Sequence, residues 1–158
     1  MRAVMLRPDA FQEIHLGPLA RFDVAKGKVA VMGRGDNPRR WVATDDVAAL
    51  TAAVATEPDP PPVLTFGGPE PLSKNQAVAV AERATGRSFK VQHLPLPVVR
   101  IGARLLARPQ EAMSTVFGLG LAQDLNPATW DDAPLRERGI RPRSATEWIE
   151  SQATAQRP

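Results

Sequence analysis

Short apolar runs alternate along this chain with longer stretches whose apolar positions recur at helical spacing. The runs end at proline, at glycine or at a change of period, which is typical of short β-strands. Strands are predicted at residues 3–6, 28–32, 63–66 and 89–94. Residues 11–22 mix apolar and polar positions around Gly17-Pro18, so this segment is predicted to be a loop with one helical turn.

Two helices begin at a capping box. Ser73 with Gln76 and Ser144 with Glu147 have the spacing at which each side chain accepts a hydrogen bond from the other residue's backbone N–H. Gly86 ends the first of these helices, because glycine readily adopts the left-handed conformation found at helix C-termini. Helices are predicted over residues 46–56, 73–86, 97–107 and 109–121, with another after residue 144.

This alternation of strands and helices predicts an α/β or α+β class. The chain has 158 residues and no internal repeat or evident boundary, so residues 1–158 are expected to form a single domain. It has no cysteine, which excludes disulfides, thiolate catalysis and cysteine-bound zinc. No signal peptide and no run long enough to span a membrane are evident, so a cytoplasmic location is expected.

The net charge of +3 is concentrated in one segment, since no acidic residue lies between Arg83 and Arg108. The helix predicted from Pro97 has a basic face and an apolar face, formed by Arg100, Arg104 and Arg108 and by Val98, Ile101 and Leu105. We expect core on the apolar side and solvent on the basic side; the alternative is a docking face for a partner or an anionic membrane. With no tyrosine and 5% aromatic residues, nucleic-acid binding is not expected.

A dinucleotide-binding loop is missing from this sequence. A Rossmann domain needs a glycine-rich turn between its first strand and helix, so that the backbone can approach the pyrophosphate. Gly33-Arg34-Gly35 lacks both a third glycine and a following helix start, and Gly118-Leu119-Gly120 lies near a helix end. The absence of tyrosine also excludes a tyrosine-lysine proton relay within the chain.

Other candidates for chemistry are few. His15 and His93 are the only histidines and have no neighbouring ligand pattern, so no metal site is predicted. His15 lies in a predicted loop, where it is a candidate to line a pocket. Asp45-Asp46 can be interpreted as an acid–base pair, but Asp46 at a helix start is expected to cap the helix instead.

Three passages carry a family resemblance. Residues 5–13 resemble the Leu-Arg-Pro-x-x-Phe-x-Glu stretch of atypical short-chain dehydrogenase/reductases, in particular the NmrA-like NAD(P)-binding proteins. Residues 41–48 resemble the later Asp-Val-Ala helix start of that family, and residues 63–87 resemble its strand, Gly-Pro-Glu turn and helix ending near Gly-Arg. Ile14 stands where the family often has asparagine. The resemblance covers only the C-terminal half of the family's usual length.

The resemblance implies the C-terminal half of a Rossmann-like fold, with few short strands and a helical substrate-side lobe from Pro97 onward. It implies NAD(P) as cofactor and a small molecule as substrate. The residues implied to border the cofactor are Pro8, Asp9, Ala10 and Phe11. Glu13 and His15 are expected at the substrate pocket, and no catalytic or metal-binding residue is predicted.

Two functions follow as hypotheses. The first is the substrate lobe of an NAD(P)-dependent oxidoreductase or sugar-nucleotide-epimerase-like protein, which is not catalytically complete alone and whose partner is an N-terminal half or a second copy. The second is a non-catalytic regulatory or scaffold protein that docks a partner through its basic helix.

Overall fold

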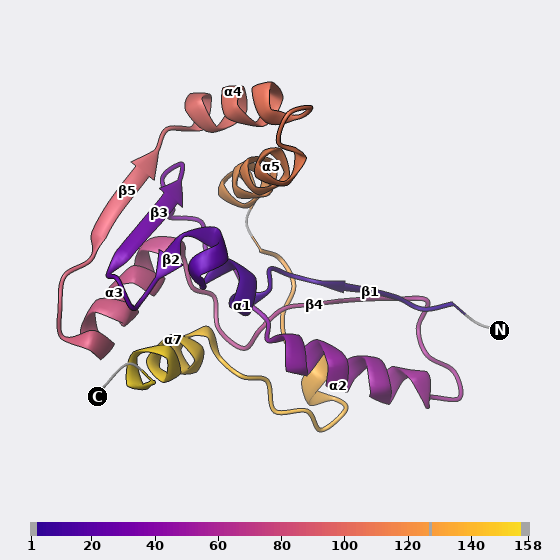
Figure 1. Ribbon diagram of the computed structural model, residues 1–158. Helices are drawn as coiled ribbons and strands as arrows, with labels where there is room; N and C mark the ends of the chain where they lie inside the picture. Colours follow the sequence, from indigo (N-terminus) through magenta and orange to yellow (C-terminus); the bar gives the residue numbers. More distant parts are fainter. Residues whose placement is uncertain (1–2, 127, 156–158) are drawn as a thin grey trace.

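The computed structural model describes residues 3–126 and 128–155 and confirms the α/β class (Figure 1). The elements in chain order are β1 (Met5–Pro8), α1 (Gln12–His15), the 3-10 turn η1 (Pro18–Ala20), β2 (Phe22–Asp23), β3 (Lys28–Met32), α2 (Thr44–Ala55), β4 (Val63–Phe66), α3 (Lys74–Thr85), β5 (Lys90–Leu94), α4 (Leu96–Leu106), α5 (Glu111–Leu125), α6 (Ala133–Arg136) and α7 (Ala145–Thr154). None of the described helices is long and apolar enough to cross a membrane.

The strands form two separate small sheets. β1 and β4 pair in parallel from Met5 opposite Val63 to Pro8 opposite Phe66. In the second sheet β3 lies between β2, to which it is antiparallel, and β5, to which it is parallel. The strands predicted at 28–32 and 63–66 are confirmed. The first strand lies two residues later than predicted and is half exposed rather than buried, because β4 is its only partner among the described residues.

Each sheet has its own hydrophobic core. Beside the three-stranded sheet, α3 and α7 pack together around Phe22, Trp41 and Ile149. Helix α2 lies along the β1–β4 ribbon (Figure 1). Leu50 and Phe66 belong to the core of this part. The helices α4 and α5 pack against each other as a lobe that projects beyond the end of β5 (Figure 1).

Both predicted capping boxes are present, at Ser73 and Ser144. The prediction that Asp46 caps its own helix is wrong. Helix α2 begins earlier, at Thr44, and the Glu13 carboxylate accepts the Thr44 N–H at 3.1 Å. Asp46 is buried, where it accepts the backbone N–H of Arg143 at 2.9 Å, and burial raises the pKa of its carboxyl group. Asp46 therefore binds Arg143, which is distant in sequence, and Glu13 caps the N-terminus of α2 instead.

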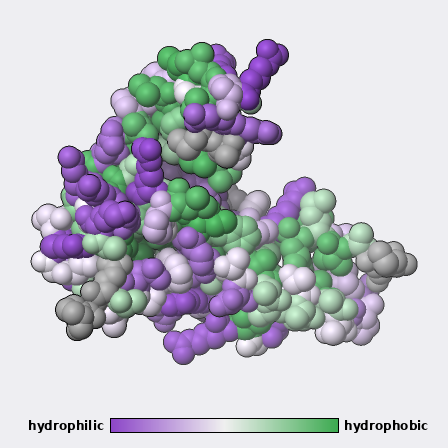
Figure 2. All heavy atoms as spheres, in the orientation of Figure 1, coloured by the Kyte–Doolittle hydropathy of each residue, from purple (hydrophilic) through white to green (hydrophobic). Residues whose placement is uncertain are grey.

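The expected orientation of α4 is also wrong. The three residues assigned to the core are 56%, 57% and 71% exposed: Val98, Ile101 and Leu105. The buried side of α4 instead holds Val99. Gly102 faces α5, since a Cβ there would lie only 3.0 Å from the Phe117 ring of that helix. Figure 2 shows apolar atoms on the outer surface of this lobe. The apolar face of α4 is therefore wider than the part of it that α5 covers.

Candidate functional site

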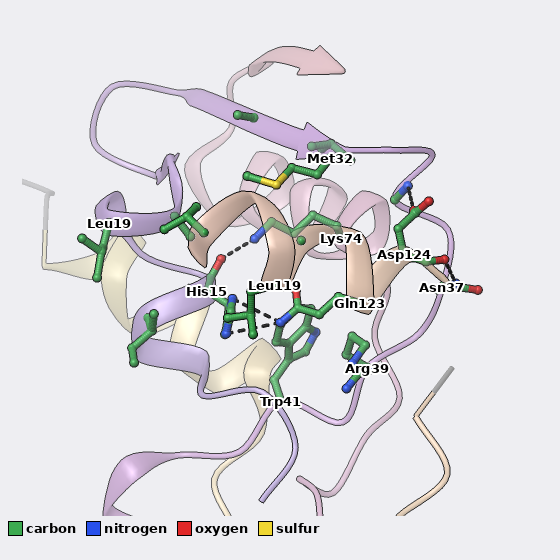
Figure 3. Close-up of a pocket in the computed structure, with 17 residues that line it drawn as sticks. His15, Leu19, Met32, Asn37, Arg39, Trp41, Lys74, Leu119, Gln123 and Asp124 are labelled. Carbon is green, nitrogen blue, oxygen red and sulfur yellow. Dashed lines mark hydrogen bonds between the residues drawn. The ribbon is translucent and has the colours of Figure 1, made fainter. Parts of the chain in front are cut away.

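A cavity of roughly 110 Å³ opens between α1, β3, α3 and α5 (Figure 3). Most of its wall is apolar, with Ile14, Leu19, Met32, Val116 and Leu119 contributing side chains. The polar side chains at the wall are those of His15, Asn37, Arg39, Lys74, Gln123 and Asp124, and Trp41 adds its indole. Apolar walls with a few polar groups are typical of small-molecule sites.

Helix α5 closes the cavity because a glycine lets it approach β3. A Cβ at Gly120 would lie 2.0 Å from the Met32 sulfur, so only glycine fits this crossing without displacing Met32. One turn later the Asp124 carboxylate accepts the backbone N–H of Gly35 at 3.1 Å. Gly35 has a φ of 72°, a conformation that glycine adopts without strain. The turn after β3 thereby fixes the end of α5 at the cavity.

Lys74, the first residue of α3, places a buried amine at the cavity. Its Nζ donates to the backbone carbonyl of His15 and lies 5.2 Å from the ring centroid of Phe22 and 5.5 Å from that of Trp41. No ion pair joins Lys74 to a carboxylate within residues 3–126 and 128–155. Burial therefore lowers the pKa of this amine to about 7.

His15 is a largely buried imidazole at the same wall. Its ring centroid lies 5.8 Å from that of Trp41, and Gln123 Nε2 lies 3.3 Å from each ring nitrogen (Figure 3). Burial, together with the nearby charges of Lys74 and Arg39, lowers the pKa of His15 to about 4. The imidazole is therefore neutral at neutral pH and can accept a hydrogen bond.

An ion pair supports the other side of Trp41. Arg39 Nη2 is paired with Asp9 Oδ1, and the side chain of Asp9 is only 1% exposed. Asp9 also accepts the backbone N–H groups of Ala10 and Arg40, at 2.8 and 3.0 Å. Asp9 therefore anchors the segment 39–41 to the end of β1.

Of the residues predicted for the site, only His15 lines the cavity. The segment Pro8 to Phe11 forms the end of β1 and the turn after it, where Asp9 and Ala10 are buried. The Ala10 carbonyl accepts the Val42 N–H at 3.0 Å, and Phe11 bridges to the same residue. Glu13 faces the start of α2. Contact of this turn with a dinucleotide, and of Glu13 with a substrate, stays a prediction.

Sequence reasoning missed Trp41, Lys74 and Gln123. One signal was available: Lys74 is a cation at the first position of a capped helix, where the helix dipole disfavours positive charge. A residue kept there against local preference is a candidate for a tertiary role. Trp41 and Gln123 carry no comparable local signal, because the partners that define their roles lie 31 and 108 residues away.

The comparisons with known proteins agree on the fold. No protein-family model matches the chain, and no curated protein matches it in sequence. The solved structures that it matches include an NADPH-dependent quinone oxidoreductase from Escherichia coli complexed with NADPH (TM-score 0.71, 17% identity, 92% of this chain and 51% of that chain). They also include the Citrobacter sp. triphenylmethane reductase complexed with NADP(H) (0.71, 13%, 93% and 51%) and an isoflavone reductase (0.69, 17%, 92% and 51%).

The chain therefore shares the Rossmann-like α/β fold of about half of each of these reductases. The resemblance predicted from residues 5–13, 41–48 and 63–87 is thereby confirmed for the fold. The chain spans about half the length of the reductases that it matches.

Proposed function

We propose that residues 1–158 form, as a single domain, the substrate-binding half of an NAD(P)-dependent oxidoreductase. The observation that carries this proposal is the cavity beneath α5, in a chain whose fold matches about half of several reductases. The apolar wall suits a small organic acceptor of hydride. The cofactor supplies the hydride, and this chain binds and orients the acceptor.

The exposure of the β1–β4 ribbon supports the proposal that the other half of the oxidoreductase packs against it. Parallel strands normally lie within larger sheets covered on both faces, whereas here Met5 and Val63 are 52% and 45% exposed. In open α/β sheets ligands bind beyond the carboxyl ends of the strands, which is where Pro8 and Phe11 lie. We propose that these two residues border the dinucleotide, while Asp9 supports them from beneath.

The test is a pair of titrations on this chain. A naphthoquinone is expected to quench tryptophan fluorescence by binding in the cavity, whereas NADPH is expected not to bind tightly. Leu119→Asp places a charge on the apolar wall and should weaken quinone binding about tenfold or more. Leu125→Asp is the matched control, because Leu125 is similarly exposed on the same helix and lies outside the cavity wall. Tight stoichiometric binding of NADPH by this chain, or quinone binding that ignores Leu119→Asp, contradicts the proposal.

A second experiment asks where the other half resides. An antibody against the tail, residues 144–158, reports the mass of the polypeptide in its source cells. A band near twice 17.1 kDa means that both halves belong to one chain. A band at 17.1 kDa directs the search to a partner chain or a second copy.

The exposed face of α4 favours a second candidate function, a regulatory protein that docks a partner. Val98, Ile101 and Leu105 form an exposed apolar stripe beside Arg100 and Arg104. Because no acidic residue occurs between Arg83 and Arg108, the complementary partner is a protein surface that is apolar at its centre and acidic at its rim. Replacing both arginines with glutamate should abolish capture of that partner and leave the fold intact. An unchanged set of captured proteins rules this function out.

A further inference from the structure

We propose that the cavity takes an aromatic or other apolar molecule that carries one anionic oxygen group, a carboxylate or a phenolate, with the Lys74 ammonium as its counter-ion. This inference rests on the proposed use of the cavity as a substrate site and adds the chemical class of the substrate. It follows from the charges at the wall, from the hydrogen bonds of Lys74 and from the shape of its surroundings.

Among the described residues, the charges facing the cavity leave Lys74 without a counter-ion. Arg39 is paired with Asp9, and the Asp124 carboxylate accepts two backbone N–H groups of the turn after β3. The remaining ionisable group, His15, is neutral at neutral pH. Desolvation is the cause of the lowered pKa of Lys74, and no carboxylate offsets it. The attraction of an anion beside Nζ would offset part of this cost.

Lys74 also has unused hydrogen-bonding capacity. An ammonium group has three N–H donors, and the carbonyl of His15 is its one oxygen acceptor within the described residues. The rings of Phe22 and Trp41 are its other close contacts, and they attract the charge without accepting a conventional hydrogen bond. A carboxylate or phenolate oxygen is the acceptor that this amine lacks.

The rest of the wall fits an apolar body attached to that oxygen. Met32, Val116 and Leu119 line the cavity with aliphatic side chains. Trp41 is 2% exposed and donates its Nε1–H to the Leu72 carbonyl at 2.7 Å, so its indole is held in one orientation. An apolar wall with a fixed shape beside an amine suits an apolar ligand with its acidic group at one end.

The competing explanation is that Lys74 only ties α3 to α1 through the His15 carbonyl. A structural lysine would affect stability and not the choice of ligand. Calorimetric titration of the chain at about pH 6.5 with 2-naphthoate and with the neutral 2-naphthylmethanol separates the two. The acid should bind about tenfold or more tightly than the alcohol, because a hydrogen bond between an ammonium and a carboxylate is stronger than one between an ammonium and a neutral hydroxyl.

Three variants make the test specific. Lys74→Met should abolish the preference for the acid and retain binding of the alcohol. Lys74→Arg should restore part of the preference, which also covers the case in which the methionine variant is poorly folded. Lys26→Met is the matched control, because the Lys26 side chain is 72% exposed and lies outside the cavity wall.

The pH dependence gives an independent readout. Naphthoate affinity should fall as the pH rises above about 7, by up to roughly tenfold per pH unit, because only the protonated amine binds the anion. Binding near neutral pH should take up a proton, seen as a dependence of the measured heat on the ionisation enthalpy of the buffer. Acid and alcohol binding equally, or acid binding unchanged in Lys74→Met, would overturn this inference alone. Failure of both ligands to bind would overturn it together with the proposed function.

Discussion

Arg39 and Asp9 form a buried ion pair that joins the end of β1 to the segment carrying Trp41. Removing Arg39 would leave a carboxylate that is 1% exposed without its cationic partner. Arg39→Ala should therefore lower the free energy of unfolding by about 3–5 kcal/mol. Chemical denaturation measures this loss. Arg34→Ala breaks a pair whose side chains are 86% and 61% exposed, and should cost less than about 1 kcal/mol. Equal losses in the two variants would contradict a structural role for the buried pair.

Glu13 should stabilise α2 from outside the helix. Its carboxylate accepts the Thr44 N–H, so Glu13→Ala leaves the first donor of α2 uncapped and should cost about 1 kcal/mol. Asp45→Ala removes a charge from the same helix end without removing a cap, and should cost about half as much. Thermal unfolding compares the two.

Glu13→Ala should leave the affinity for naphthoquinone unchanged, because Glu13 is not part of the cavity wall. A weakened affinity would instead support the substrate role that the resemblance implies for Glu13.

Neighbouring valines test the orientation of α4. Val99 is fully buried and Val98 is 56% exposed, although they are adjacent in sequence. Val99→Ala should destabilise the fold by about 2 kcal/mol, since it deletes buried methyl groups. Val98→Ala should change stability by less than about 0.5 kcal/mol. The reverse order of effects in urea denaturation would restore the orientation predicted from the sequence.

His15 should make the fold acid-sensitive. Its pKa is lowered from 6.5 to about 4, so the folded state binds this proton less readily than the unfolded state does. The stability linked to His15 is therefore complete above about pH 6.5 and is lost as the pH falls toward 4, by an amount on the order of 3 kcal/mol. His15→Gln should remove this part of the pH dependence between pH 7.5 and 4, measured by denaturation at each pH. His93→Gln is the control, because that side chain is exposed, and an identical pH profile for His15→Gln and the parent would contradict the prediction.

The sequence predicted features whose causes lie within a few residues. Each capping box joins residues three positions apart, so Ser73 and Ser144 mark the start of their helices whatever the surroundings. Short apolar runs between turn residues likewise predicted the strands at 28–32 and 63–66. Motif order and spacing also pointed to the fold, which the solved reductase structures confirm.

Only the tertiary structure decided the site and the exposed surfaces. Gln123 reaches His15 across 108 residues of chain, and Gly120 allows this by bringing α5 onto Met32. Helical spacing described the apolar arc of α4 correctly, but the part of that arc which is buried depends on where α5 lies. Lys74 is a cavity residue because the fold buries its amine beside two aromatic rings. Periodicity and capping depend on local backbone geometry, whereas burial and the convergence of side chains depend on contacts between distant segments.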